Sequence, residues 1–193
     1  MTTADGSWAR RLHEVYGVQP EAGFGPLTVD VAAADWAASL RAARDVLGCG
    51  FFDFITAVDL LDDGFDVLAH VACPRRGKVD SVLLRARLPR DAPRVDCVCA
   101  VYAGAGWHER ETHEMFGIDI AGHADLDPLL LPDGFVGHPL RKDFVLASRV
   151  AKPWPGAKEP GESDDAAAPG RRRTRPPGVP DPSSWPASRP SGT

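Results

Sequence analysis

The sequence predicts an α+β domain in two layers, with a mixed, largely antiparallel sheet packed on helices. Two observations lead to this prediction. The first part of the chain holds two segments with apolar residues at helical spacing, and the middle holds segments in which apolar and polar residues alternate as on strands. Strands that follow one another without intervening helices favour a meander over a parallel sheet. The chain of 193 residues, 44% of them hydrophobic, is long enough for one domain, residues 1–146, and a tail, residues 147–193.

Two helices and a short strand are expected before residue 50. Ser7 can cap the first helix, and the segment from Pro26 to Val31 fits a short strand. Asp35 can open the second helix, which ends at Gly48 to Gly50 because glycine favours the backbone conformation of a helix C-cap. The apolar stripes are Trp8, Leu12, Val15 and Tyr16 on the first helix and Trp36, Leu40, Ala43 and Leu47 on the second.

Strand signals occupy the next fifty residues. One strand is expected from Phe51 to Leu61, and the tight-turn signal Asp62-Asp63-Gly64 joins it to a second strand from Phe65 to Ala72. A third strand is expected from Val79 to Leu88, and a final one from Val95 to Tyr102.

Four cysteines bear on the redox setting of the chain: Cys49, Cys73, Cys97 and Cys99. They are expected to be reduced thiols, because the sequence has neither a secretory signal nor an apolar run of about 18 residues. Cys97 and Cys99 are separated by one residue, whereas metal-binding cysteine pairs are usually separated by two. On the expected strand they share a face with Val95 and Val101, so we interpret them as small apolar core residues.

The segment 107–144 combines charge, histidine, glycine and proline at a density that a plain core does not tolerate. Such groups must pair with one another or face a partner. A helix is expected from Trp107 to Phe116, ended by Gly117. One short helical turn is expected at Asp127-Pro128, and the chain should then be irregular and extended to Phe144.

The tail from residue 147 contains 10 of the 18 prolines and almost no aliphatic residues, so we expect it to be disordered. From Arg149 onward there are 8 Lys and Arg against 5 Asp and Glu, which leaves a net charge of −8 on the preceding part. An acidic body argues against binding to nucleic acid.

The histidines of the segment 107–144 suggest a zinc-dependent hydrolase as one alternative. The stretch from His108 to His113 is similar to H-E-x-x-H, but the second histidine comes one residue late. Side chains at i and i+5 on a helix diverge by about 140°, so they cannot share a metal as an i, i+4 pair does. A zinc site would need a further ligand from His123 or His138.

Acid–base catalysis is a second alternative. Four carboxylates could supply a catalytic pair: Glu109, Glu111, Glu114 and Asp143. Because Arg110, Arg141 and Lys142 lie among them and lower carboxylate pKa values, we expect an ion-pair network instead. The sequence also lacks G-x-G-x-x-G, a P-loop lysine and G-x-S-x-G. We therefore expect no catalytic residue, no cofactor site and no metal site in this chain.

What remains is a strip in which apolar residues alternate with charged ones: Phe116, Leu129, Leu130, Leu131, Phe135 and Leu140. Such a strip either folds back on its own sheet or docks on another protein. Its aromatic and arginine anchors favour docking.

Two sequence signatures carry a family resemblance. E-R-E-T-H-E-M-F-G, which begins at Glu109, and G-H-P-L-R-K-D-F, which begins at Gly137, resemble the C-type subunit of NADH:quinone oxidoreductase (respiratory complex I), the 30 kDa subunit family. The resemblance implies a peripheral-arm scaffold at the cytoplasmic face of the cell membrane. It would pack on the hydrogenase-like D-type subunit, near the B-type subunit and other arm subunits. NADH, FMN, iron–sulfur clusters and quinone belong to the whole complex, so the chain is an enzyme only as a subunit and touches the membrane only through the complex.

Carried over by position, the residues of the first signature are Glu109, Arg110, Glu111, Met115, Phe116 and Gly117. Those of the second are His138, Pro139, Leu140, Arg141, Lys142 and Asp143. Their implied role is structural and interfacial. The family usually has an aromatic residue and then Asp at His113-Glu114, which indicates a divergent member. The same signature is shared with the equivalent subunit of membrane-bound hydrogenases and formate-oxidising complexes, so such a subunit is an alternative.

Overall fold

The computed structural model describes residues 6–23 and 25–145, and it confirms the α+β class. The helices are α1 (Gly6–Tyr16), α2 (Trp36–Asp45) and α3 (Ala105–Phe116), with short 3-10 helices η1 (Ala33–Asp35) and η2 (Leu61–Asp63). The strands are β1 (Leu27–Val31), β2 (Phe51–Asp59), β3 (Phe65–Arg75), β4 (Lys78–Leu88), β5 (Arg94–Asp96) and β6 (Asp119–Ala121). The tail that the sequence predicts to be disordered lies outside the described residues.

Four strands form one mixed sheet in the order β1-β4-β3-β2. Strands β2, β3 and β4 are antiparallel neighbours, which is the expected meander, whereas β1 pairs with β4 in parallel. The register places Val67 opposite Ala86 and Ala69 opposite Leu84. Because opposed residues point to the same side of a sheet, the apolar positions of β3 and β4 cover one face together.

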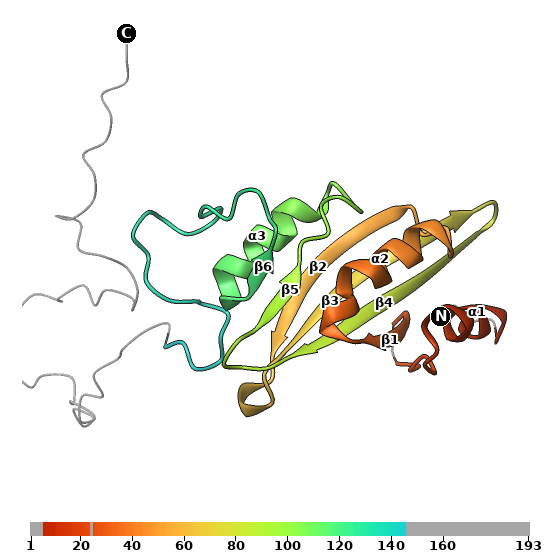
Figure 1. Cartoon of the computed structure of the whole chain (residues 1–193), viewed down its shortest axis with the longest axis horizontal. Coiled ribbons are helices and arrows are strands. Elements are labelled where there is room, and N and C mark those ends of the chain that lie inside the picture. The colour runs from red at the N-terminus through yellow and green to blue at the C-terminus, as the bar shows by residue number, and fades with distance from the viewer. Residues whose placement is uncertain (1–5, 24, 146–193) are drawn as a thin grey trace, which may run out of the picture.

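The helices supply the second layer of the core. Figure 1 shows α2 lying across the sheet, with α1 near β1 and α3 near β2, the two edge strands. The stripe expected for the second helix is buried: Trp36, Leu40, Ala43 and Leu47. Helix α1 buries Trp8 and Leu12, and the Trp8 indole donates a hydrogen bond of 2.8 Å to the carbonyl of Ser81 in β4. The segment after residue 90 packs on this core.

The expected final strand from Val95 to Tyr102 is wrong in length and place. Strand β5 ends at Asp96 and pairs in parallel with β6, a short strand that the sequence did not predict, in a separate two-stranded sheet. After β5 the backbone turns, because the carbonyl of Val98 accepts the N–H groups of Val101 at 2.8 Å and Tyr102 at 2.9 Å. The buried residues Val98, Val101 and Tyr102 are spaced three and four positions apart, as in a helical turn. In so short a segment, this spacing cannot be told apart from the alternation of a strand.

The turns of the meander also differ from expectation. Strand β2 ends at Asp59 rather than at Leu61, and Gly64, with φ 91°, begins the return. A Cβ at Gly64 would overlap the carbonyl oxygen of Leu88, so only glycine fits this close approach. At the other end, Arg76-Gly77 alone joins β3 to β4, because both strands extend beyond their expected ends.

A disulfide joins Cys49 to Cys73, so the expectation of four reduced thiols is wrong for this pair. Both residues are buried, Cys49 just before β2 and Cys73 within β3. The pairing of these strands, with Phe51 opposite Ala72, brings together two cysteines that are 24 residues apart. The spacing of the cysteines in the sequence could not show this neighbourhood.

The described chain after β6 is irregular, as expected, but the helical turn predicted at Asp127-Pro128 is absent from it. In Figure 1 this segment, coloured blue-green, loops away beside α3 and returns toward the turn between β2 and β3. No helix among the described residues is long and apolar enough to cross a membrane.

Candidate functional site

The two sequence signatures lie against each other at the C-terminal end of α3. The helix begins two residues before the expected Trp107 and ends at Phe116, as predicted. Gly117 follows with φ 69°, the left-handed conformation of a C-cap. The chain passes this helix end again between His138 and Arg141. The candidate site is therefore built from α3, its cap and the chain after β6, residues 122–145, which we call the returning segment.

Glu109, the first residue of the first signature, is a core anchor with 1% of its surface exposed. One carboxylate oxygen accepts the N–H of Val98 at 2.6 Å. The other accepts the thiols of Cys97 at 3.0 Å and Cys99 at 3.2 Å. Glu109 thus fastens the turn after β5 to α3, and its carboxylate is satisfied within the chain.

Cys97 and Cys99 lie beside this carboxylate and not on a strand face, which differs from the interpretation of plain core residues. Burial, and then the hydrogen bond to Glu109, raises the pKa of the Cys97 thiol. Burial, followed by hydrogen bonds with Cys97 and Glu109, raises the pKa of the Cys99 thiol. Both thiols are therefore protonated donors at neutral pH. His123, which follows β6, places its Nε2 at 3.7 Å from Glu109 Oε2.

Arg110 and Glu114 hold the loop that follows β6. The Arg110 guanidinium donates to the carbonyl of Asp127 at 2.7 Å and lies 3.7 Å from the Asp125 carboxylate. The Glu114 carboxylate accepts three consecutive backbone N–H groups, those of residues 129–131, at 2.8 to 3.2 Å. These backbone groups bond to α3 side chains, which explains why no helical turn forms at Asp127.

The second signature packs on the end of α3, where glycine leaves room. His138 Nδ1 donates to the carbonyl of Glu114 at 2.8 Å, and Arg141 Nε donates to the carbonyl of Phe116 at 2.6 Å. The last carbonyls of a helix have no partner within the helix, so these two side chains cap it. A Cβ at Gly117 would overlap the His138 imidazole and would stand 2.6 Å from Arg141 Nη2.

Phe65 in β3 links the signatures to the sheet. Its fully buried ring meets Phe116 edge-on, with the ring centroids 6.4 Å apart. The guanidinium carbons of Arg90 and Arg141 lie 5.4 Å and 5.3 Å from its centroid. Each such cation–π contact stabilises a fold by about 0.5–2 kcal/mol, so Arg141 both caps α3 and packs on the core.

Asp59, at the end of β2, anchors the backbone of the returning segment. Its buried carboxylate accepts the N–H groups of Lys142 and Leu61 and Nη1 of Arg90, each at 2.8 Å. Arg90 also pairs with Asp143 at 2.6 Å. Burial raises the pKa of Asp59, but the hydrogen bonds from the two amides and from Arg90 outweigh it, so the pKa lies below its ordinary value.

Sequence reasoning missed Asp59 and Arg90, and it named Glu114 only as a candidate catalytic carboxylate. A signal for Asp59 was present, because it follows Ile55 and Ala57 at two-residue spacing on the face that β2 buries. A polar residue on the core side of a strand needs a partner. Arg90 carries no comparable signal, because it stands in a loop and meets its partners only through the fold.

Apolar side chains of the returning segment point outward while many of its polar groups bond inward. Four of them form what we call the C-terminal apolar set: Leu130, Val136, Leu140 and Val145, with 56%, 73%, 52% and 61% of their surface exposed. The backbone N–H of Leu140 is nevertheless fixed to the carbonyl of Met115 at 3.1 Å. Of the other predicted site residues, Met115 and Pro139 are half-buried, whereas Glu111 and the side chain of Lys142 are exposed.

The histidines of the zinc-hydrolase alternative are not gathered around one point. His113 Nδ1 donates to the carbonyl of Ile118 at 2.8 Å, and His138 caps α3. The His108 ring stands edge-on to Phe52, 5.4 Å between centroids. In the described part of the chain, the side chains close enough to share a metal ion are a different group: Cys97, Cys99, Glu109 and His123.

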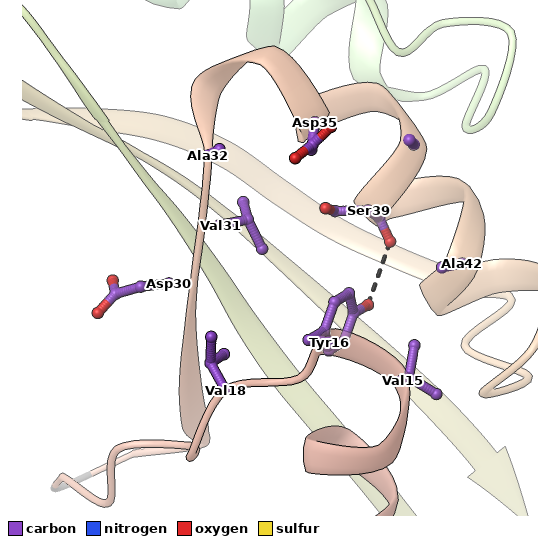
Figure 2. A pocket seen from close by; sticks show the side chains of 10 residues that line it. Val15, Tyr16, Val18, Asp30, Val31, Ala32, Asp35, Ser39 and Ala42 are labelled. Atoms are coloured by element: carbon purple, nitrogen blue, oxygen red, sulfur yellow. Dashed lines mark hydrogen bonds between the residues drawn. The ribbon is translucent and has the colours of Figure 1, made fainter.

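A hollow of about 340 Å³ lies between α1, β1 and α2. Figure 2 shows the Tyr16 hydroxyl directed at Ser39, whose carbonyl accepts a hydrogen bond of 3.1 Å, with valine and alanine side chains around them. Asp30 lies on the other side of β1 from Tyr16 in this view and pairs with Arg85. The lining is mainly aliphatic, so we place no chemistry there.

Comparison with known proteins covers most of the described domain. Residues 29–150 match the family model described as "Respiratory-chain NADH dehydrogenase, 30 Kd subunit". The C-type subunit of the NADH-quinone oxidoreductase of Rhizobium rhizogenes is 39% identical over 159 residues, which cover 78% of this chain and 77% of that protein. The C-type subunit of the F(420)H(2) dehydrogenase of Methanosarcina mazei is 42% identical over 98 residues, 48% of this chain and 61% of that protein.

A solved structure gives a similar result. The structure titled "Nqo5 of the trypsin-resistant fragment (1-134)" superposes with a TM-score of 0.53 at 26% identity, covering 61% of this chain and 97% of that one.

Proposed function

We propose a function from one premise: the chain belongs to the family of the 30 kDa subunit of respiratory-chain NADH dehydrogenase, since the family model matches more than half of it. The chain is therefore the C-type subunit of complex I or of a related complex. Its proposed role is that of a non-catalytic scaffold in the peripheral arm of a proton-translocating NADH:quinone oxidoreductase. Other subunits would bind NADH, FMN, the iron–sulfur clusters and quinone, at the cytoplasmic face of the membrane.

The proposed docking partner is the D-type subunit, with the B-type subunit and other arm subunits as further neighbours. One observation carries this proposal: each residue of the C-terminal apolar set is more than half exposed. Protein interfaces concentrate apolar contacts at their centre, where charged residues are depleted. The segment turns His138 and Arg141 inward to α3 and leaves leucine and valine side chains exposed, which provides apolar surface of the kind found at such a centre.

The anchoring of this segment supports the same role. Arg141 and His138 fix it to the end of α3, and the Lys142 amide is bonded to the buried Asp59. A surface held in place before binding loses less conformational entropy when a partner arrives. The residues of both signatures therefore act mainly by positioning the surface that the partner would contact.

Co-purification with the D-type subunit tests this proposal. The variant Val136→Glu/Leu140→Glu places two charges in the apolar set without removing any of the hydrogen bonds described above. We expect its affinity for the D-type subunit to fall by roughly tenfold or more, because desolvating one charge exceeds about 1.4 kcal/mol. The matched control is Val46→Glu/Val79→Glu, since these valines, at the end of α2 and in β4, are 63% and 62% exposed. Equal binding of the two variants would contradict docking through the apolar set.

A second candidate function keeps the scaffold role and changes the electron donor. The 42% identity with an F(420)H(2) dehydrogenase subunit supports a related complex that oxidises another donor. Hydrogenase and formate-oxidising complexes are further alternatives of this kind. Assays of the purified complex with NADH, reduced F420, formate and hydrogen as separate donors distinguish these alternatives. The whole complex is needed, because other subunits and not this chain would select the donor.

A further inference from the structure

Four side chains with metal-binding chemistry converge beneath α3. Cys97 and Cys99 come from the turn after β5, Glu109 from α3, and His123 from the residues after β6. One ligand atom from each lies within 4.8 Å of the ligand atoms of the other three. The fold therefore brings three segments of the chain together at one point, and each contributes a side chain of a type that binds divalent metals.

The imidazole of His123 supplies an independent observation. Its side chain is only 7% exposed, and its Nε2 has no hydrogen-bond partner among the described residues. The nearest carboxylate oxygen, Oε2 of Glu109, is 3.7 Å away, which is beyond hydrogen-bond reach. A buried polar atom without a partner is destabilising, and this one lies within reach of the ligand atoms of the two thiols and the carboxylate.

We infer that Cys97, Cys99, Glu109 and His123 form a structural zinc site. Zinc prefers four ligands drawn from thiolate, imidazole and carboxylate groups in a tetrahedron. Bonds of about 2.0–2.3 Å place tetrahedral ligand atoms roughly 3.3–3.8 Å apart, so the four side chains need to move little. Glu109 can bind through Oε2 while Oε1 keeps its hydrogen bond to the Val98 amide.

The types of the four ligands also indicate which metal the site would bind and whether the site is structural or catalytic. All four positions of the tetrahedron are filled by protein, which is the pattern of a structural site and leaves no open position for substrate. Iron–sulfur clusters are held by four cysteines in the common case, and this group contains two. Zinc has no redox chemistry, so the site is compatible with a subunit that carries no electrons.

Binding of zinc would change the hydrogen bonds of the two cysteines and of His123. The thiols of Cys97 and Cys99 release the protons that they now donate to Glu109. His123 Nδ1 now accepts the N–H of Asp125 at 3.1 Å, and binding zinc through Nε2 requires a proton on Nδ1. Zinc binding therefore breaks that hydrogen bond.

The zinc site does not depend on which protein the chain docks on. Zinc at this point would tie the β5 turn and the chain after β6 to α3, just before the loop held by Arg110 and Glu114. It would thus stiffen the base from which the returning segment departs. Failure of zinc binding would leave the docking proposal intact, and failure of docking would leave the zinc site intact.

Metal binding by the purified full chain tests the inference. After chelation and dialysis against zinc, we expect one zinc per chain by elemental analysis and a higher midpoint of thermal unfolding than in the chelated chain. Cobalt substitution should give the visible absorption of tetrahedral cobalt together with a thiolate charge-transfer band. Zinc below a tenth of an equivalent, or iron with sulfide in its place, would overturn the inference.

Cysteine variants keep the test independent of folding. In Cys97→Ser and Cys99→Ser the hydroxyl can still donate to Glu109, so the metal-free network is preserved while a soft ligand is lost. We expect the affinity for zinc to fall by roughly 100-fold or more in each. His108→Gln, on the same helix, is the control and should bind zinc as the unmodified chain does. Zinc affinity that is unchanged by the serine variants, or lost in the control, would assign the metal elsewhere.

Discussion

At the scale of single residues, Gly117 decides whether the second signature can reach α3. Its φ of 69° disfavours any other residue, and an added Cβ would overlap His138 and approach Arg141 Nη2 to 2.6 Å. We expect Gly117→Ala to lower the free energy of unfolding by about 2–4 kcal/mol, from left-handed strain together with the steric clash. Urea unfolding measures this loss.

Gly122 provides the matched control for this variant. Its φ is 80°, but an added Cβ would meet nothing within 4 Å. Gly122→Ala should therefore lose only the conformational part, about 1 kcal/mol. If the two alanine variants lost equal stability, the close approach of His138 and Arg141 to the helix end would not matter energetically.

Asp59 gives the fold a dependence on pH. A carboxyl group whose pKa is lowered in the folded state stabilises that state above its unfolded pKa, about 3.9, and loses this contribution as the pH falls through the folded pKa. The lowered pKa of Asp59 thus predicts a loss of stability below about pH 4. We expect Asp59→Asn to lower the free energy of unfolding by about 3 kcal/mol at pH 7, because Arg90 loses a buried partner, and to flatten the acid dependence.

Urea unfolding at a series of pH values measures both effects. The control is Asp119→Asn, whose ion pair with Arg94 is exposed on both sides. Its effect at pH 7 should stay below about 1 kcal/mol. An Asp59→Asn chain that kept the full acid dependence of the unmodified chain would show that other carboxyl groups cause it.

At the scale of elements, helix α3 acts as a backbone-binding surface for the loop after β6. Glu114 accepts the N–H groups of three consecutive residues, Leu129 to Leu131. In Glu114→Gln one acceptor oxygen becomes a donor that faces the same N–H groups. We expect faster hydrogen exchange at these three amides and a loss of about 1–3 kcal/mol.

Glu111 on the same helix is the control for Glu114, since it is exposed. Glu111→Gln should leave the exchange of residues 129–131 unchanged. Mass spectrometry of peptides that span this loop makes the comparison. Equal protection of the loop in both variants would mean that the carboxylate of Glu114 does not hold it.

The elements that the sequence predicted well are those with a long, regular pattern. Helix α2 and the strands β3 and β4 carry apolar residues at one period over ten or so positions, and their burial largely follows that period. The misplaced strand at Val95 to Tyr102 is short. Its backbone turns where the Val98 N–H bonds to Glu109, which stands eleven residues further along the chain. A contact of that kind is invisible to a local pattern, whereas the period of a long strand is visible.

At the scale of the whole molecule, the signature residues could be named from the sequence but their neighbours could not. Family resemblance supplied the two signatures. It did not supply Asp59 and Arg90, which lie in a strand end and a loop and join the second signature only because the chain returns to the turn between β2 and β3. The four zinc-site residues were likewise visible in the sequence as separate facts, and the fold alone brings them together.

The bond between Asp59 and the Lys142 amide spans 83 positions of the sequence. A ribosome synthesises the chain from its N-terminus, and domains fold largely in that order. The residues of the sheet and of all three described helices therefore leave the exit tunnel before Lys142 does. Leu140 and Val145 flank this attachment, so the face that they help to form is incomplete until the C-terminal end of the described domain has been synthesised.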